Sequence, residues 1–175
     1  VMLSVVLVLL YYVSTVLQSL AGGFLFTIYD PESFNSLFIL IRSAGLVILW
    51  IVSNWMICTL MGGKGKLREI IIITCYSLIP IIVKNFIRLI LTNVLIPTEA
   101  TFLGILDTIA ILYFGIMLII GLLKVHDFSM SRLVGTSALS VAGIAAIVFL
   151  MIMFVILVQQ FWGFILTVAT EIISL

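Results

Sequence analysis

The side chains that could support metal or nucleophilic chemistry are few and widely spaced. The only histidine, His126, has one acidic neighbour, Asp127, and no cysteine beside it, so these residues cannot complete a metal site. We expect His126 to be a loop residue that bonds to backbone or solvent. The sequence contains no Ser–His–Asp arrangement, no carboxylate pair at catalytic spacing and no cofactor fingerprint. We therefore expect a protein that is not an enzyme and has no cofactor.

The motif Gly63-Lys64-Gly65-Lys66 resembles a phosphate-binding loop only superficially. It lacks the G-x-x-x-x-G-K-[ST] spacing, and it follows a long apolar segment rather than a β-strand. A tight turn between two helices is the simpler interpretation. Basic residues near a membrane surface attract acidic lipids, so contact with anionic headgroups or with an acidic partner is the functional alternative. The residues that we consider for such contacts are Lys64, Lys66, Arg68, Lys124, His126 and Asp127.

Two charged residues, Arg42 and Asp107, lie inside apolar segments. Each is about one to two turns from the same end of its predicted helix. A charge within hydrocarbon is costly unless it is paired or hydrated. We expect Arg42 and Asp107 to face the interior and to pair as a clamp between helices, with a substrate pathway as the alternative role. Lys84, Arg88 and Glu171 are other possible partners at similar depth.

Three further features concern helix packing. Asn54 lies deep in its segment, where an amide is expected to form a hydrogen bond to another helix. Small side chains at Ala138, Ala142 and Ala146 share one helix face, which allows another helix to approach closely. Pro80 should kink the helix that contains it.

The amino-acid composition indicates that lipid rather than water surrounds these residues. Hydrophobic residues make up 65% of the 175 positions and charged residues 9%, whereas soluble domains are about half apolar and about a quarter charged. Eight basic and seven acidic side chains cannot cover a soluble surface of this size, so the apolar excess must face lipid. The net charge of +1 gives no strong electrostatic attraction to nucleic acid.

The apolar segments predict an all-α transmembrane bundle that forms a single domain over residues 1–175. A helix needs about 20 apolar residues to cross a bilayer. Gly22-Gly23 are expected to kink or end the first span. The five predicted spans are residues 1–29, 34–61, 67–88, 101–123 and 133–158, and residues 161–175 either extend the last helix or lie along the membrane surface.

The loop charges predict the orientation. Basic residues concentrate in the loops between spans two and three and between spans four and five, whereas the other two loops are acidic. Because basic loops remain in the cytosol, we expect the N-terminus inside and the C-terminus outside. Lys84 and Arg88 are exceptions on the outer side.

Several short motifs resemble one family. Asn54-Trp55, Gly63-Lys64-Gly65 and Tyr76-x-x-x-Pro80, with the loop from His126 to Ser129, are similar to the pattern of the Yip-domain family, whose eukaryotic branch interacts with Ypt/Rab proteins. The resemblance implies five spans and a cytosolic N-terminus, and it does not imply a catalytic reaction. We favour the bacterial branch, and hence a bacterial cytoplasmic membrane over a eukaryotic endomembrane.

Two functions remain open at this point. The favoured one is a membrane scaffold or accessory subunit that binds other membrane proteins, and for a bacterial member an ABC-type transporter is a hypothetical partner. The alternative is a small transporter or channel that uses Arg42, Asn54, Lys84 and Asp107. A transporter should place these residues around a polar cavity, whereas a scaffold should hold them in closed bonds.

Overall fold

The computed structural model describes residues 2–23, 26 and 35–173, and all regular structure in them is helical. Among these residues, five helical segments are long and apolar enough to cross a membrane, as predicted. The third span consists of two helices, and the fourth begins with a short 3₁₀ turn. The elements are α1 (Met2–Ala21), α2 (Ser36–Leu60), α3 (Leu67–Ser77), α4 (Ile79–Thr92), η2 (Pro97–Glu99), α5 (Ala100–His126) and α6 (Met130–Ile173).

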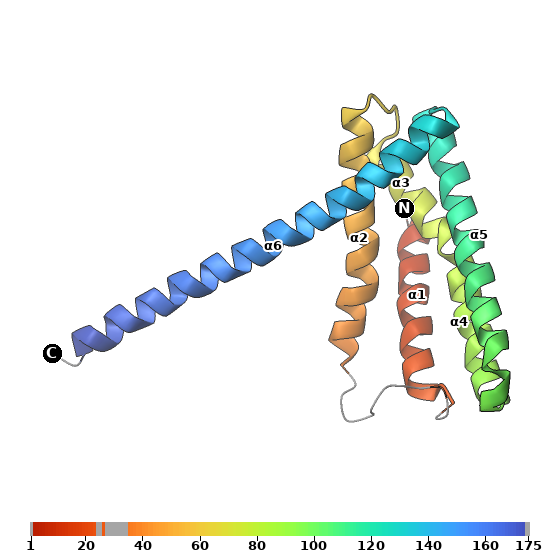
Figure 1. Cartoon of the computed structure of the whole chain (residues 1–175), viewed down its shortest axis with the longest axis horizontal. Helices are drawn as coiled ribbons and strands as arrows, with labels where there is room; N and C mark the ends of the chain where they lie inside the picture. The colour runs from red at the N-terminus through yellow and green to blue at the C-terminus, as the bar shows by residue number, and fades with distance from the viewer. Residues whose placement is uncertain (1, 24–25, 27–34, 174–175) are drawn as a thin grey trace.

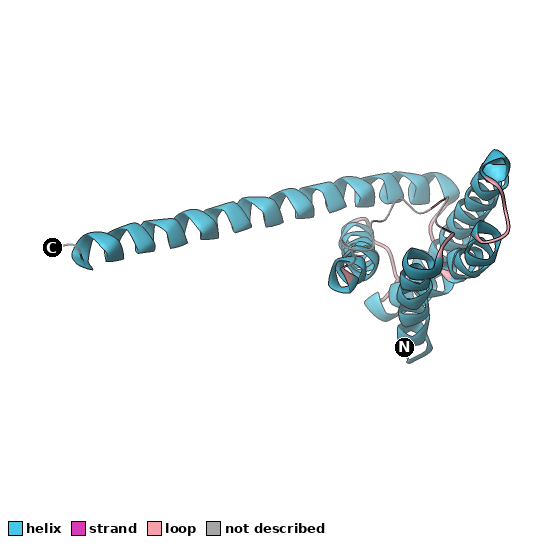
Figure 2. Ribbon diagram, turned by 90° about the horizontal axis from the view of Figure 1, so that it is seen from below, coloured by secondary structure: helices cyan, strands magenta, loops and turns pink. Residues whose placement is uncertain are grey.

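The first four spans form a bundle, whereas α6 crosses one end of it and then projects away (Figure 1). Helix α4 packs between α1 and α5, and α2 packs against α1, α3 and α6. The view from below shows the same departure of α6 from the other helices (Figure 2). The bundle is therefore built by α1 to α5, and α6 is attached to it over only part of its length.

Glycine and capping side chains set several helix boundaries. Helix α1 ends at Ala21, before Gly22 and Gly23, so the first span is shorter than predicted; residues 24, 25 and 27–34 lie outside the described residues. The Asn35 side chain accepts a hydrogen bond from the N–H of Phe38 at 3.1 Å and caps α2. Gly62, with φ of +73°, provides the left-handed turn after α2.

Pro80, where the sequence predicts a kink, lies beside a break in the third span. The third span is interrupted at Leu78, which separates α3 from α4, and Pro80 lies in the first turn of α4. Proline has no N–H to continue a helical ladder, but it is tolerated in a first turn. The regular pattern resumes where the N–H of Ile82 donates to the carbonyl of Leu78 at 3.0 Å.

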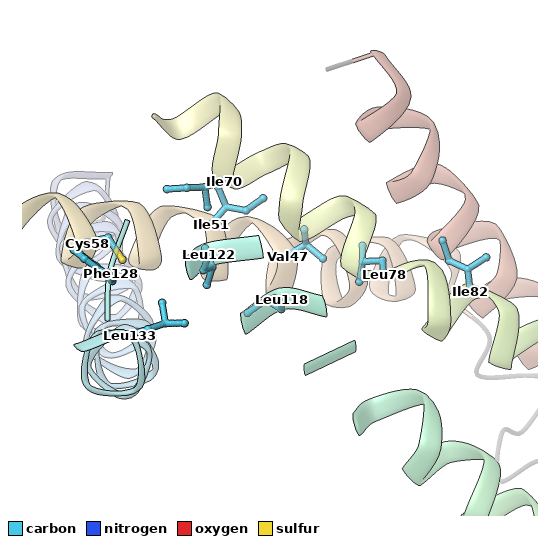
Figure 3. Packing of buried hydrophobic residues seen from close by; sticks show 10 residues of the cluster. All are labelled: Val47, Ile51, Cys58, Ile70, Leu78, Ile82, Leu118, Leu122, Phe128 and Leu133. Atoms are coloured by element: carbon cyan, nitrogen blue, oxygen red, sulfur yellow. The ribbon is translucent and has the colours of Figure 1, made fainter. Parts of the chain in front are cut away.

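The buried apolar cluster lies between α2, α3, α4, α5 and the beginning of α6 (Figure 3). Helix–helix association in lipid depends on close packing and polar bonds, because lipid tails are as apolar as leucine. The cluster consists of Val47, Ile51, Cys58, Ile70, Leu78, Ile82, Leu118, Leu122, Phe128 and Leu133.

Helix α6 packs on α2 through a face that begins at Leu133 and continues through Thr136, Ser140 and Gly143. Ser53 of α2 donates to the carbonyl of Ser140 at 2.6 Å. The alanine face that the sequence singled out (Ala138, Ala142 and Ala146) is exposed and does not pack inside this chain. Hydroxyl groups form interhelical bonds that alanine cannot form, which explains why the polar face is the one that docks on α2.

Candidate functional site

Two loops meet at one end of the bundle, as the charge pattern predicted. The turn after α2 packs against the turn between α5 and α6. A Cβ atom added at Gly63 would lie 2.5 Å from Nδ1 of His126, and one added at Gly65 would lie 2.8 Å from the same atom. The two glycines therefore allow the turn to approach the imidazole ring closely. We call residues 62–66 together with residues 126–132 the loop clasp.

His126 is the centre of the loop clasp. Its side chain is 1% exposed, and neither ring nitrogen has a hydrogen-bond partner among the described residues. The ring stacks on Phe128 with centroids 5.4 Å apart. The guanidinium of Arg132 lies 4.7 Å from the Phe128 centroid and donates to the carbonyl of Met61. The expectation of a loop histidine bonded to backbone or solvent was wrong, because Gly63 and Gly65 leave room for the loop to cover the ring.

The rim of the loop clasp is charged and exposed. Lys64 forms an ion pair with Asp127 at 2.9 Å, but both side chains are largely exposed, so the pair contributes little to stability. The Glu69 carboxylate accepts the N–H of Lys66 at 2.9 Å at the start of α3. The other exposed basic residues at this end are Arg68, Lys124 and Arg132. The rim is therefore predominantly basic and suited to an acidic contact.

A second charged cluster joins α4 and α5 near the opposite end of the bundle. Lys84 lies 3.3 Å from Oδ1 of Asp107, and Arg88 bonds to Oδ2 of the same carboxylate. The side chains of Lys84, Arg88 and Asp107 are 18%, 25% and 30% exposed. The three residues are thus partly withdrawn from the medium around the bundle.

The structure does not form the expected Arg42–Asp107 pair. Asp107 instead meets two of the alternative partners, Lys84 and Arg88, because α4 packs against α5 whereas α2, which carries Arg42, packs against α1, α3 and α6. Arg42 is exposed, and Glu171 is exposed near the end of α6. The clamp between helices is present, but it joins a different pair of helices.

Asn54 forms the predicted bond between helices. Its amide, which is fully buried, donates to Oγ of Ser140 at 3.3 Å. The Cys58 thiol lies 3.7 Å from the Asn54 side-chain oxygen. The amide thereby holds α6 to α2 at the beginning of the last span.

Sequence reasoning missed the polar contacts of α1 with α4. Asn85 donates to Oγ of Ser14 at 3.0 Å, and Asn93 donates to the carbonyl of Ala21 at 3.0 Å. An isolated asparagine within an apolar segment is the signal that identified Asn54. The same signal was available for Asn85.

The described residues form two polar clusters, one at each end of the bundle. Within residues 2–23, 26 and 35–173, no three His, Cys, Asp or Glu side chains converge as metal ligands would. The two clusters consist of a packed loop junction and an ion-paired helix joint. Both can hold elements together and present charge to a partner.

The comparisons with known proteins give one match. No curated protein and no solved structure matches the chain. The family model of the Yip1 domain matches residues 1–158, which is most of the chain and includes all five spans in whole or in part. The chain therefore belongs to the Yip1-domain family of integral membrane proteins.

Proposed function

We propose that this protein is a non-enzymatic membrane scaffold or accessory subunit that binds other membrane proteins along α6. The main support is the length of α6. Its 44 residues correspond to about 66 Å at 1.5 Å per residue, whereas the hydrocarbon core of a bilayer is about 30 Å thick. A helix that only had to cross the membrane would need about half this length.

The side chains of α6 beyond the bundle form a large apolar surface. Every described side chain from Val148 to Val168 is exposed, including the bulky Phe154, Phe161 and Trp162. Exposure to lipid alone costs an apolar helix little, so this surface is available to lipid and to a partner helix alike. Aromatic residues are enriched in the cores of protein interfaces, which supports a partner.

The alanine face of α6 supports the same proposal. Ala138, Ala142 and Ala146 are exposed while the adjoining polar face holds α6 to α2. Small side chains allow two helix backbones to approach closely in lipid. We propose this face as the place where a partner helix lies nearest to the bundle.

The loop clasp supports an orientation and a second contact. We propose that the clasp lies in the cytosol, with the N-terminus inside and the C-terminus outside, because its basic rim follows the positive-inside rule. Lys64, Lys66 and Arg68 would then meet an acidic surface of a partner or anionic headgroups. For a bacterial cytoplasmic membrane we propose an ABC-type transporter permease as the partner, because it offers lipid-facing helices on which α6 can pack.

The small transporter or channel is the less favoured alternative. Asn54 is held in bonds between α2 and α6, whereas Lys84 and Asp107 pair between α4 and α5, so these residues do not share one site. Arg42 lies on α2 and is exposed. Closed bonds at separate helix joints favour a scaffold. A flux assay in proteoliposomes would separate the two functions, because only a transporter would give solute flux above that of empty vesicles.

Photo-crosslinking in cells tests the scaffold. We would replace Phe154 of α6 with p-benzoylphenylalanine and use the same replacement at Phe102 of α5 as the matched control, since both side chains are exposed. We expect discrete protein adducts at Phe154, identifiable by mass spectrometry, and none at Phe102. Absence of adducts at Phe154, together with purification in mild detergent without a stable partner, would contradict the proposal.

A further inference from the structure

We propose that the groove between α4 and α5 binds an acyl chain of an acidic phospholipid whose phosphate meets Lys84 and Arg88. The groove has a volume of about 500 Å³, within the range of pockets that bind small molecules. Pro80, Val83, Lys84 and Ile87 line it from the side of α4, and Ala110 and Tyr113 line it from α5. One cation thus lies in a wall that is otherwise apolar or aromatic.

The charge of this cluster favours an anion as the ligand. Lys84 and Arg88 share the carboxylate of Asp107, so the three side chains carry one net positive charge. An unpaired charge in the apolar region of a membrane is costly. A phosphodiester supplies the missing negative charge, and the planar guanidinium of Arg88 is suited to bind two phosphate oxygens. Because Lys84 and Arg88 are 18% and 25% exposed, a molecule beside the bundle can reach them.

The position of the cations along the helix fits a phospholipid. By helical rise, Arg88 and Lys84 are about 6 Å and about 12 Å from the C-terminal end of α4 at Thr92. Long basic side chains at this depth can extend toward the headgroup region. From Lys84 the groove continues to Pro80, where the third span is interrupted. A phosphate at the cations would therefore place its acyl chain along the groove toward the middle of the membrane.

A second groove provides an internal comparison. It lies among α1, α2 and α3, has a volume of about 470 Å³, and is lined by aliphatic side chains such as Val5 together with Ser4 and Cys75. A groove of this kind accepts any acyl chain. Lys84 in its wall, together with Arg88 on the same carboxylate, distinguishes the groove between α4 and α5 and should select the headgroup. This inference does not depend on the scaffold, because α6 takes no part in it.

The experiment measures lipid retention by native mass spectrometry. The full chain is reconstituted in phosphatidylcholine vesicles with or without phosphatidylglycerol, extracted in mild detergent, and its bound lipids are counted. We expect the wild-type chain to retain phosphatidylglycerol in preference to phosphatidylcholine. Replacing Lys84 and Arg88 with glutamine should weaken retention by roughly fivefold for each residue. Replacing Arg42 of α2, which is exposed and does not line this groove, with glutamine is the matched control and should leave retention unchanged.

Three single variants test the site without removing its cations. Val83→Trp fills the groove between α4 and α5 and should abolish selective retention of phosphatidylglycerol. Val5→Trp fills the groove among α1, α2 and α3 and should preserve that selectivity. The two valines are matched in exposure, at 50% and 55%. Asp107→Asn removes the competing carboxylate and should increase retention of phosphatidylglycerol. Equal retention by the wild-type chain and the Lys84/Arg88 double variant would overturn the proposal. So would equal retention of the two lipids by the wild-type chain.

Discussion

Gly63→Ala should loosen the loop clasp. A Cβ atom at this position would lie 2.5 Å from Nδ1 of His126, 2.9 Å from the carbonyl oxygen of Cys58 and 3.0 Å from Cζ of Phe128. The carbonyl belongs to the backbone and the two rings are stacked, so none of the three can move away independently. Overpacking of this kind typically costs about 1–3 kcal/mol. We expect the free energy of unfolding in dodecyl sulfate titrations to fall by that amount.

The matched control for this substitution is Gly104→Ala in α5. A Cβ atom added at Gly104 meets nothing within 4 Å, and alanine is favoured over glycine inside a helix by about 1 kcal/mol. This variant should therefore be neutral or slightly more stable than the wild-type chain. The comparison separates the packing of the loop clasp from any general effect of replacing glycine.

Alkylation of Cys58 gives a local measurement of how far Gly63→Ala opens the loop clasp. The thiol is fully buried, and the Cys58 carbonyl accepts the N–H of Gly63 at 2.7 Å. If local opening controls access, a loss of about 1–3 kcal/mol should accelerate maleimide labelling of Cys58 by roughly 5- to 150-fold. Cys75, which is buried in α3, should keep its labelling rate. Peptide mapping distinguishes the two sites.

A double-mutant cycle with His126→Ala tests whether contact with the imidazole ring causes the loss of stability in Gly63→Ala. Truncating the imidazole removes the nearest atom to the new methyl group, so Gly63→Ala should cost less in that background. A coupling of about 0.5–3 kcal/mol is expected for residues in contact. Additive effects of the two substitutions, or a Gly63→Ala variant as stable as the wild-type chain, would refute this account of the loop clasp.

Three further substitutions test other joints, each measured as the free energy of unfolding in dodecyl sulfate. Asp107→Asn leaves the cations of Lys84 and Arg88 unpaired. Removing one partner of a buried ion pair costs about 3–5 kcal/mol of stability. We expect a loss of about 1–2 kcal/mol here, because these side chains are partly exposed. Gly143→Leu should separate α6 from α2 and lower stability, because a Cβ atom added at Gly143 lies 2.5 Å from Oγ of Ser53. Gly135→Leu is its control and should leave this contact intact, because a Cβ atom added at Gly135 meets nothing within 4 Å. Lys64→Gln should change stability by less than about 1 kcal/mol, because the ion pair of Lys64 with Asp127 is exposed. A larger loss would mean that charge rather than packing holds the loop clasp together.

Hydropathy was sufficient to predict the five spans, and Pro80 marks the break in the third span. Both follow from local rules: a bilayer needs a minimum apolar length, and proline cannot continue a helical ladder. The bond from Asn54 to another helix was also predictable, because a buried amide in an apolar segment must find a partner. The identity of that partner, Ser140, was not.

The partner of Asp107 could not be predicted, because depth alone does not determine which helices are neighbours. Arg42, Lys84 and Arg88 were all plausible partners by position along their helices, and only the packing of α4 on α5 selects the last two. The docking face of α6 was missed for a related reason. Small residues permit close approach on two faces of this helix, and the hydroxyl of Ser53 on the neighbouring helix selects the face of Ser140.

Because α6 is attached to the bundle only over residues 130–147, a rotation there moves its distal part as a rigid arm. From Ile147, the last residue of α6 that is partly buried among those with described side chains, to Ile173 the helix runs for about 39 Å with a rise of 1.5 Å per residue. A rotation of about 10° at the attachment to α2 would displace the far end by about 7 Å. The loop clasp lies about 22 Å from Ile147 by the same rise, so an adjustment of about one ångström there would become about 2 Å at the distal tip.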